Sequence, residues 1–172
     1  MMNAISVLQE GAQWAHEFLE MVTADVTPEQ AHWRPLGIAN PLGAIYAHAV
    51  LAEDGVINGM LKGSASLFAS TWAGKTGVSD PQFQMTLEWA QGLKVDLPTF
   101  RQYAQAVYTA TNDYLASLTD ESLSRQIDLS NVGLGQKPLS WCLNALVISH
   151  LNNMIGEISC LKGLQGAKGY PF

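Results

Sequence analysis

The chain has 172 residues, of which 48 % are hydrophobic and only 14 % are charged, well below the ~25 % of a typical soluble domain. This composition excludes a largely disordered chain and supports one domain with its own core, while no run of about 18 apolar residues occurs that could cross a membrane. A net charge of −6 argues against nucleic acid as a partner, because an acidic surface repels phosphate. The N-terminal end lacks a basic stretch followed by an apolar core, so we expect a cytoplasmic protein that binds neither nucleic acid nor membrane.

The first part of the chain carries the pattern of two long helices. Apolar residues spaced by threes and fours predict a helix over 4–24 with one buried stripe. A threonine and a proline at 27–28 indicate a capped, short helical turn that ends near residue 35. Asn40-Pro41 repeats this start signal, so a second long helix is expected over 41–61.

The remainder of the chain is less regular before it becomes helical again. Residues 63–95 should contain short helices, with one helical patch at 83–91, because a structureless loop of that length is unusual. A third long helix is predicted over 98–118 and a last one over 139–161. Residues 125–140 alternate like extended chain. The sequence therefore predicts an all-α fold, a four-helix bundle with a short extended or hairpin segment before the last helix.

Helix geometry places two histidines where chemistry could occur. At about 100° per residue, His150 and Met154 lie within about 30° of the centre of the apolar stripe of the last helix, so both should point into the bundle. His48 lies about 120° to one side of the bulky stripe of the second helix. A row of small residues beside it would let a partner helix or a ligand approach closely; the row consists of Ala44, Ala52, Gly55 and Gly59.

Spacing alone leaves two interpretations of His48 and His150 open. They are either core histidines satisfied by hydrogen bonds or a pair of metal ligands on facing helices. His16 and His32 are interpreted as surface or packing residues. The side chains of the adjacent Glu53 and Asp54 project from their helix about 100° apart, so they cannot form one carboxylate pair. Both residues are interpreted as solvated helix surface.

Three groups of motifs follow one another along nearly the whole chain. They are Thr27-Pro28-Glu29-Gln30 with Trp33-Arg34-Pro35, Asn40-Pro41-Leu42-Gly43 with His48, and His150-x3-Met154-x-Gly156-Glu157-Ile158. In this order they resemble the DinB-like superfamily. The resemblance implies a single DinB-like helical bundle domain over 1–172, with a metal held by one histidine on the second helix and a His-x3-His pair on the last. It also implies a homodimer and, as in the better understood branches, a hydrolase or a thiol-dependent S-transferase.

Residue by residue, His48 matches the second-helix ligand and His150 the first histidine of the last-helix pair, while Met154 stands in the place of the second. A thioether is a soft, neutral ligand that replaces imidazole poorly on zinc or nickel. The resemblance thus implies a divalent metal, zinc or nickel, on His48 and His150, with Met154 lining the site of a small-molecule substrate. The alternative, which Met154 favours, is a metal-free small-molecule-binding or stress-related interaction protein with a degenerate metal site.

Overall fold

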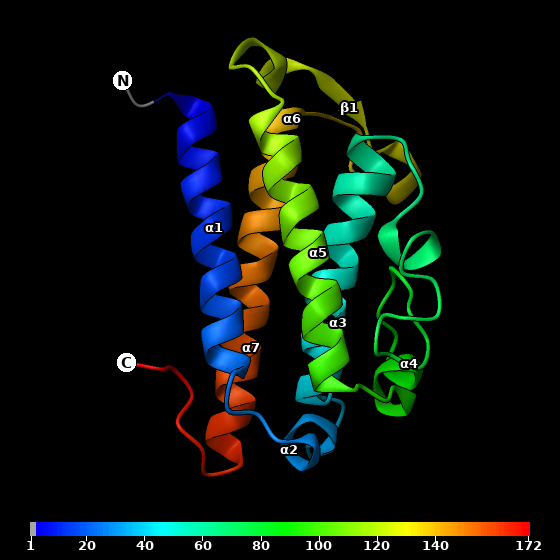
Figure 1. Cartoon of the computed structure of the whole chain (residues 1–172), viewed down its shortest axis with the longest axis vertical. Helices are drawn as coiled ribbons and strands as arrows, with labels where there is room; N and C mark the ends of the chain where they lie inside the picture. The colour runs from blue at the N-terminus through cyan, green and yellow to red at the C-terminus, as the bar shows by residue number, and fades with distance from the viewer. Residues whose placement is uncertain (1–2) are drawn as a thin grey trace.

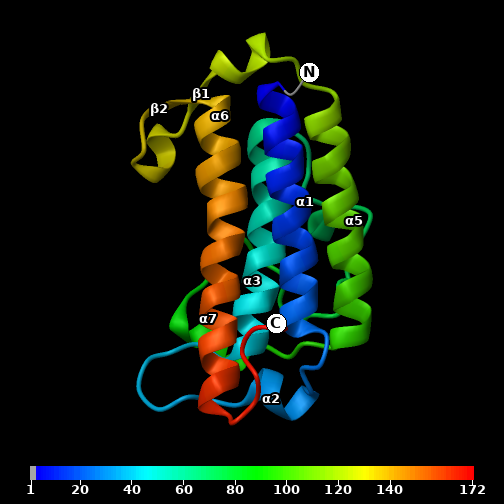
Figure 2. The same ribbon diagram turned by 90° about the vertical axis from the view of Figure 1, so that its left-hand side faces the viewer.

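Four long helices run side by side in the structure, as Figures 1 and 2 show, and they confirm the predicted all-α bundle. The computed structural model describes residues 3–172, so Met1 and Met2, the start of the predicted domain, lie outside the described residues. The four rods are built on α1 (Ala4–Thr23), α3 (Leu42–Asp54), α5 (Leu97–Ala116) and α7 (His150–Leu164). Their bounds lie within a few residues of those that the apolar spacing predicts, apart from the end of α3 and the start of α7, where π-helical segments take up the rest of the predicted ranges.

The bundle has two pairs of parallel neighbouring helices, α1 with α7 and α3 with α5, that a simple up-and-down arrangement would lack. In Figure 1, α1 and α7 run downward, whereas α3 and α5 both run upward and are joined by the long crossover 62–96. Each of α1 and α3 packs beside both α5 and α7, so α1 and α3 face each other across the interior. The long crossover makes this order feasible, because short connections allow only antiparallel neighbours.

Two of the four rods contain a π-helical segment. After Asp54, α3 continues as the π-helical segment η1 (Gly55–Leu61), and the last rod runs from α6 (Leu139–Cys142) through the π-helical η5 (Leu143–Ser149) into α7. A π-helix bonds residue i to i+5, so each residue turns by less than the 100° of an α-helix. The buried stripe of the last rod is shifted as a result: His150 is half-buried at its edge, and Leu151 takes the fully buried position.

The short elements lie between the rods and at their ends. The predicted turn near residue 28 is α2 (Pro28–His32), which begins with a complete capping box on Thr27. The predicted hairpin is present as β1 (Gln126–Asp128) paired antiparallel with β2 (Gln136–Pro138). The other short elements are η2 (Leu67–Ala69), α4 (Leu87–Gly92), η3 (Glu121–Ser124) and η4 (Ser130–Val132).

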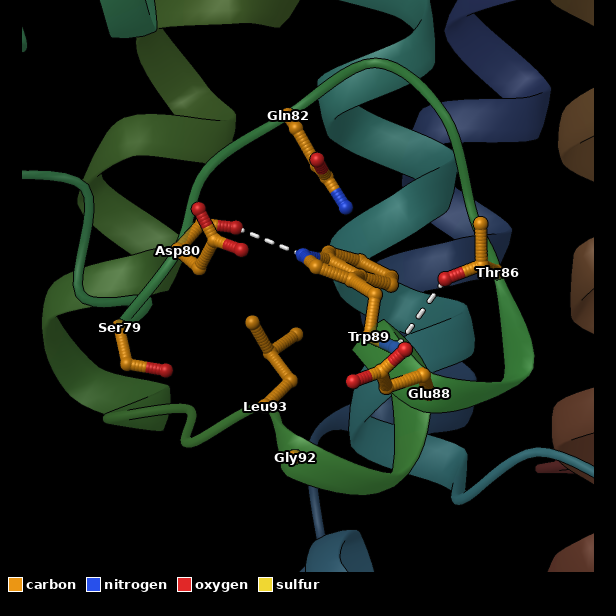
Figure 3. A pocket seen from close by; sticks show the side chains of 8 residues that line it. All are labelled: Ser79, Asp80, Gln82, Thr86, Glu88, Trp89, Gly92 and Leu93. Carbon is orange, nitrogen blue, oxygen red and sulfur yellow. Dashed lines mark hydrogen bonds between the residues drawn. The ribbon is translucent and has the colours of Figure 1, made fainter.

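The crossover between α3 and α5 is tied down at its second half. Val78 pairs with Val95, and the amide of Asp96 donates to the carbonyl of Gly77 at 2.7 Å. Gly77 has φ +82°, and a Cβ there would lie 2.6 Å from the amide nitrogen of Phe100, so a side chain does not fit. A hollow of about 450 Å³ lies inside this loop. Beside it the indole of Trp89 donates to the carbonyl of Asp80 at 2.8 Å (Figure 3). In the same crossover, the ring of Phe83 lies against Gly55 of η1.

None of the helices within residues 3–172 combines the length and the apolar character needed to cross a membrane.

Candidate functional site

The side chains of His48 on α3 and His150 on α7 meet between two adjacent rods. Their Nε2 atoms are 3.2 Å apart, and the two rings are almost perpendicular, at 83°. The Nδ1 atom of each ring is buried and has no hydrogen-bond partner among the residues that the structure describes. Each imidazole therefore has its Nε2 directed at the other and its Nδ1 unsatisfied, which is uncommon for buried polar groups.

This pair of nitrogens has the separation of two ligands on one metal ion. Two imidazole nitrogens bound at 2.0–2.1 Å to a tetrahedral ion lie about 3.3 Å apart, close to the 3.2 Å between His48 and His150. A third ligand of the usual kind is missing, since no group of three His, Cys, Asp or Glu side chains in residues 3–172 is placed to hold a metal. The residues present thus fit two positions of a zinc or nickel site and leave the others to solvent, substrate or Met154.

Both imidazoles lie in surroundings that favour their neutral forms. Burial, reinforced by the proximity of His150, lowers the pKa of His48 to about 4. Burial also lowers the pKa of His150, while the negative charge of Glu53 opposes this shift. Near neutral pH both rings therefore keep a free lone pair, which a metal ion or a hydrogen-bond donor requires.

A pocket of about 260 Å³ opens directly onto the two histidines. Its walls are otherwise apolar and come from α3 and η1, the crossover, the hairpin region and η5: Ala52, Val56, Met60, Phe83, Val132, Leu134, Ala145 and Leu146. No charged side chain is among these lining residues. The pocket therefore combines one polar spot, the imidazole pair, with a hydrocarbon wall, as small-molecule sites commonly do.

The mouth of the pocket is made by residues that the sequence reasoning did not connect with the histidines. Phe83 and Leu134 belong to irregular segments and Val132 ends η4; the three residues are 38 %, 40 % and 50 % exposed, respectively. The ring of Phe83 lies on Gly55, where an added Cβ would come within 2.3 Å of a ring carbon. The row of small residues beside His48 was the available signal, since Ala52 lines the pocket and Gly55 accommodates Phe83.

Met154 and His32 have clear positions outside the pocket. Met154 is only 8 % exposed and packs in the core, one helical turn beyond His150, and it is not among the residues that line the pocket. A role for Met154 in substrate binding stays a prediction. His32 binds the carbonyl of Pro28 through Nδ1 at 2.7 Å and accepts from the amide of Val95 at Nε2, which is a packing role.

A second histidine contact lies inside the bundle and involves a carboxylate. Nε2 of His16 on α1 is 2.8 Å from Oε1 of Glu53 on α3, and the hydroxyl of Thr111 donates to the same oxygen. His16 is buried and stacks on Tyr108, and Glu53 is 1 % exposed. The interpretation of Glu53 as solvated surface is therefore wrong, because α1 and α5 supply its partners and cover it. Oε2 of Glu53 has no hydrogen-bond partner in the described part of the chain.

The interpretation of Asp54 as solvated surface is wrong as well. Asp54 is fully buried and accepts four hydrogen bonds, two at each carboxylate oxygen. The donors are the amide of Asn58, the backbone amides of Leu67 and Phe68, and the hydroxyl of Tyr103. This carboxylate joins α3, the crossover and α5 immediately behind the pocket wall.

The free energy of unfolding of the metal-free protein should fall as the pH is lowered from about 6.5. Because the pKa of His48 is about 4 in the folded protein and about 6.5 in an unfolded chain, only the unfolded state binds this proton between those values. The loss stops near pH 4, where both states are protonated. We expect His48→Gln to remove about 2 kcal/mol of the difference between pH 7 and pH 4.5.

Urea unfolding with a chelator present, at both pH values, measures this difference for wild type and variant. An equal pH dependence in the two proteins would contradict the expected depression of the His48 pKa.

Taken together, the fold and the site define a four-helix-bundle protein with a two-histidine pocket between its second and last rods. The sequence profile of the DinB superfamily matches residues 12–157, and the chain belongs to this superfamily. The fold is also similar to the crystal structure of a conserved protein from Enterococcus faecalis, with a TM-score of 0.77 and 23 % sequence identity over 95 % of this chain and 98 % of that one. Sequence comparison with curated proteins finds no significant match.

Proposed function

We propose that this DinB-superfamily protein binds a divalent metal ion, zinc or nickel, on His48 and His150 and acts on a small electrophile as a hydrolase or a thiol S-transferase. The observation that carries the proposal is the approach of the two Nε2 atoms to 3.2 Å across two rods. A hydrogen bond between the rings would account for this distance too, and both arrangements leave the two buried Nδ1 atoms without a partner among the described residues. Two metal–nitrogen bonds offset that cost better than one hydrogen bond does.

Within this proposal the chain holds and shields the reacting groups. His48 and His150 would supply two neutral nitrogen ligands, and the other side chains that line the pocket are apolar. When bound, the metal would supply Lewis acidity, lowering the pKa of a water molecule or a thiol at an open position. The packing of α3 against α7 holds the backbones of the two histidines in place relative to each other.

A second candidate function is metal-free binding of a small molecule, or an interaction role in stress, in which Met154 has replaced the third histidine of the family. Its support is the absence of any three-residue group of metal-binding side chains in residues 3–172, together with the burial of Met154 in the core. In this case the imidazole pair would serve as the hydrogen-bonding group of the pocket.

A homodimer is a further part of the proposal. The outer face of α1 carries Val7, Trp14 and Met21 at intervals of seven residues, and they are 53 %, 48 % and 40 % exposed. Apolar side chains in a line along one helix are what an interface between two copies would bury.

Metal content distinguishes the two functions. Protein purified without a histidine tag should contain stoichiometric metal by mass spectrometry, and His48→Ala should lose it. His32→Gln is the matched control, since His32 is half-buried but is held by backbone groups of Pro28 and Val95. Wild-type protein that carries no metal and takes up none from added zinc or nickel would refute the metal-dependent function and leave the metal-free one.

A further inference from the structure

The side chains that line the pocket at His48 and His150 restrict the charge of the molecule that can bind there. None of its lining residues is an aspartate, glutamate, lysine or arginine, and the only polar groups are the two imidazoles. Away from the imidazoles, a carboxylate or ammonium group buried among these apolar side chains would lose its hydration without gaining an opposite charge, and burying an unpaired charge is strongly unfavourable. An uncharged group meets no such penalty.

The volume of the pocket restricts the size of the molecule that can bind in it. An apolar cavity of about 150 Å³ is known to admit benzene, and this pocket measures about 260 Å³. It therefore has room for an aromatic ring system or a short alkyl chain of comparable bulk, with one polar atom directed at the imidazoles. A larger ligand would have to displace the residues at the mouth.

Phe83, at the mouth of the pocket, lies directly against a glycine of η1. All three of the nearest atoms that a Cβ on Gly55 would meet belong to the ring of Phe83, at 2.3, 2.9 and 3.4 Å. Gly59, one turn further along the same π-helical segment, has only the Ser66 hydroxyl nearby, at 3.6 Å from such a Cβ. Because residue 55 has no side chain, the ring of Phe83 can lie against it and close the pocket.

From these observations we infer that the pocket takes uncharged, largely apolar small molecules, and that Phe83, seated on Gly55, is its specificity-determining residue. This inference rests on the proposed function in taking the histidine pocket as the binding site. It assigns the class of substrate or ligand: an uncharged electrophile with a hydrocarbon body.

The test compares two ligands of the same shape, 2-naphthol and 2-naphthoate, by calorimetric titration of chelator-treated protein at pH 7.5. We expect 2-naphthol to bind at least about tenfold more tightly, because only the naphthoate must bury a charge. Phe83→Ala should weaken the binding of 2-naphthol about fivefold or more through the loss of apolar contact. Since Phe83 is partly exposed on an irregular segment, this variant should fold normally.

Variants of the glycines then test whether the position of the Phe83 ring depends on the absence of a side chain at Gly55. Gly55→Ala should weaken 2-naphthol binding in the wild-type background and change it less than about twofold in the Phe83→Ala background, because the three atoms nearest to a methyl group there all belong to Phe83. Gly59→Ala is the matched control and should bind like wild type. Failure of 2-naphthol to bind, equal or tighter binding of 2-naphthoate, or affinity unchanged by Phe83→Ala would overturn the inference. Metal content of the same preparations reports separately on the proposed function.

Discussion

Replacing Asp54 by alanine is expected to lower the free energy of unfolding by about 3–5 kcal/mol. The carboxylate accepts its four hydrogen bonds in the interior, at distances of 2.7 to 3.0 Å. Alanine would leave the backbone amides of Leu67 and Phe68 and the hydroxyl of Tyr103 without acceptors where water does not replace them. The effect should be large because three separate parts of the chain lose their common anchor.

Urea unfolding at pH 7, followed by circular dichroism, measures this effect. Asp128→Ala is a suitable control, since Asp128 is exposed and accepts from Ser130 in the hairpin, and it should cost less than about 1 kcal/mol. Asp54→Asn should fall between the two, because an amide nitrogen in place of either oxygen would face two donors instead of accepting from them. A loss of stability in Asp54→Ala no greater than in Asp128→Ala would show that this buried anchor is dispensable.

Introducing a third imidazole is expected to raise the affinity for zinc by about 100-fold or more. Met154 lies four residues after His150 on α7, so the two positions share one face of the helix. Met154→His would complete the three-nitrogen set that tetrahedral zinc prefers and would replace a soft, neutral sulfur ligand. The gain should be largest if His48 and His150 already hold the ion on their own.

Competition with a chromophoric chelator measures the zinc affinity of wild type and variant. Asn152→His is the matched control, because Asn152 is exposed and points away from His150, two residues along the same helix. Adding His48→Ala to Met154→His should abolish most of the gain. Should Met154→His bind zinc no better than Asn152→His, the proposal that Met154 occupies the place of a metal ligand would be untenable.

The rods of this bundle could be predicted because their cause is local. Apolar residues at spacings of three and four mark a buried stripe wherever they occur, and caps such as Thr27 mark the start of a helix. The hairpin before the last rod also followed from short-range alternation. What the periodicity could not reveal was the pair of π-helical segments, which displace the stripe and set His150 at its edge.

The environment of the charged residues could not be predicted for the opposite reason. Glu53 and Asp54 look like helix surface in sequence, since a charged pair is normally solvated. Their burial depends on partners far away along the chain: His16 and Thr111 for Glu53, and Tyr103 with the crossover for Asp54.

The sequence by itself determined the class of fold, the family and the two histidines that share one site, because helix periodicity and motif order can be recognised from short stretches of chain. The tertiary structure alone decided that Phe83, Val132 and Leu134 close an apolar pocket over those histidines and that two acidic side chains lie in the core. The physical reason is that burial and the pairing of polar groups are properties of packed neighbours, and these neighbours can lie far apart in the chain, as do His48 and His150, which are 102 residues apart.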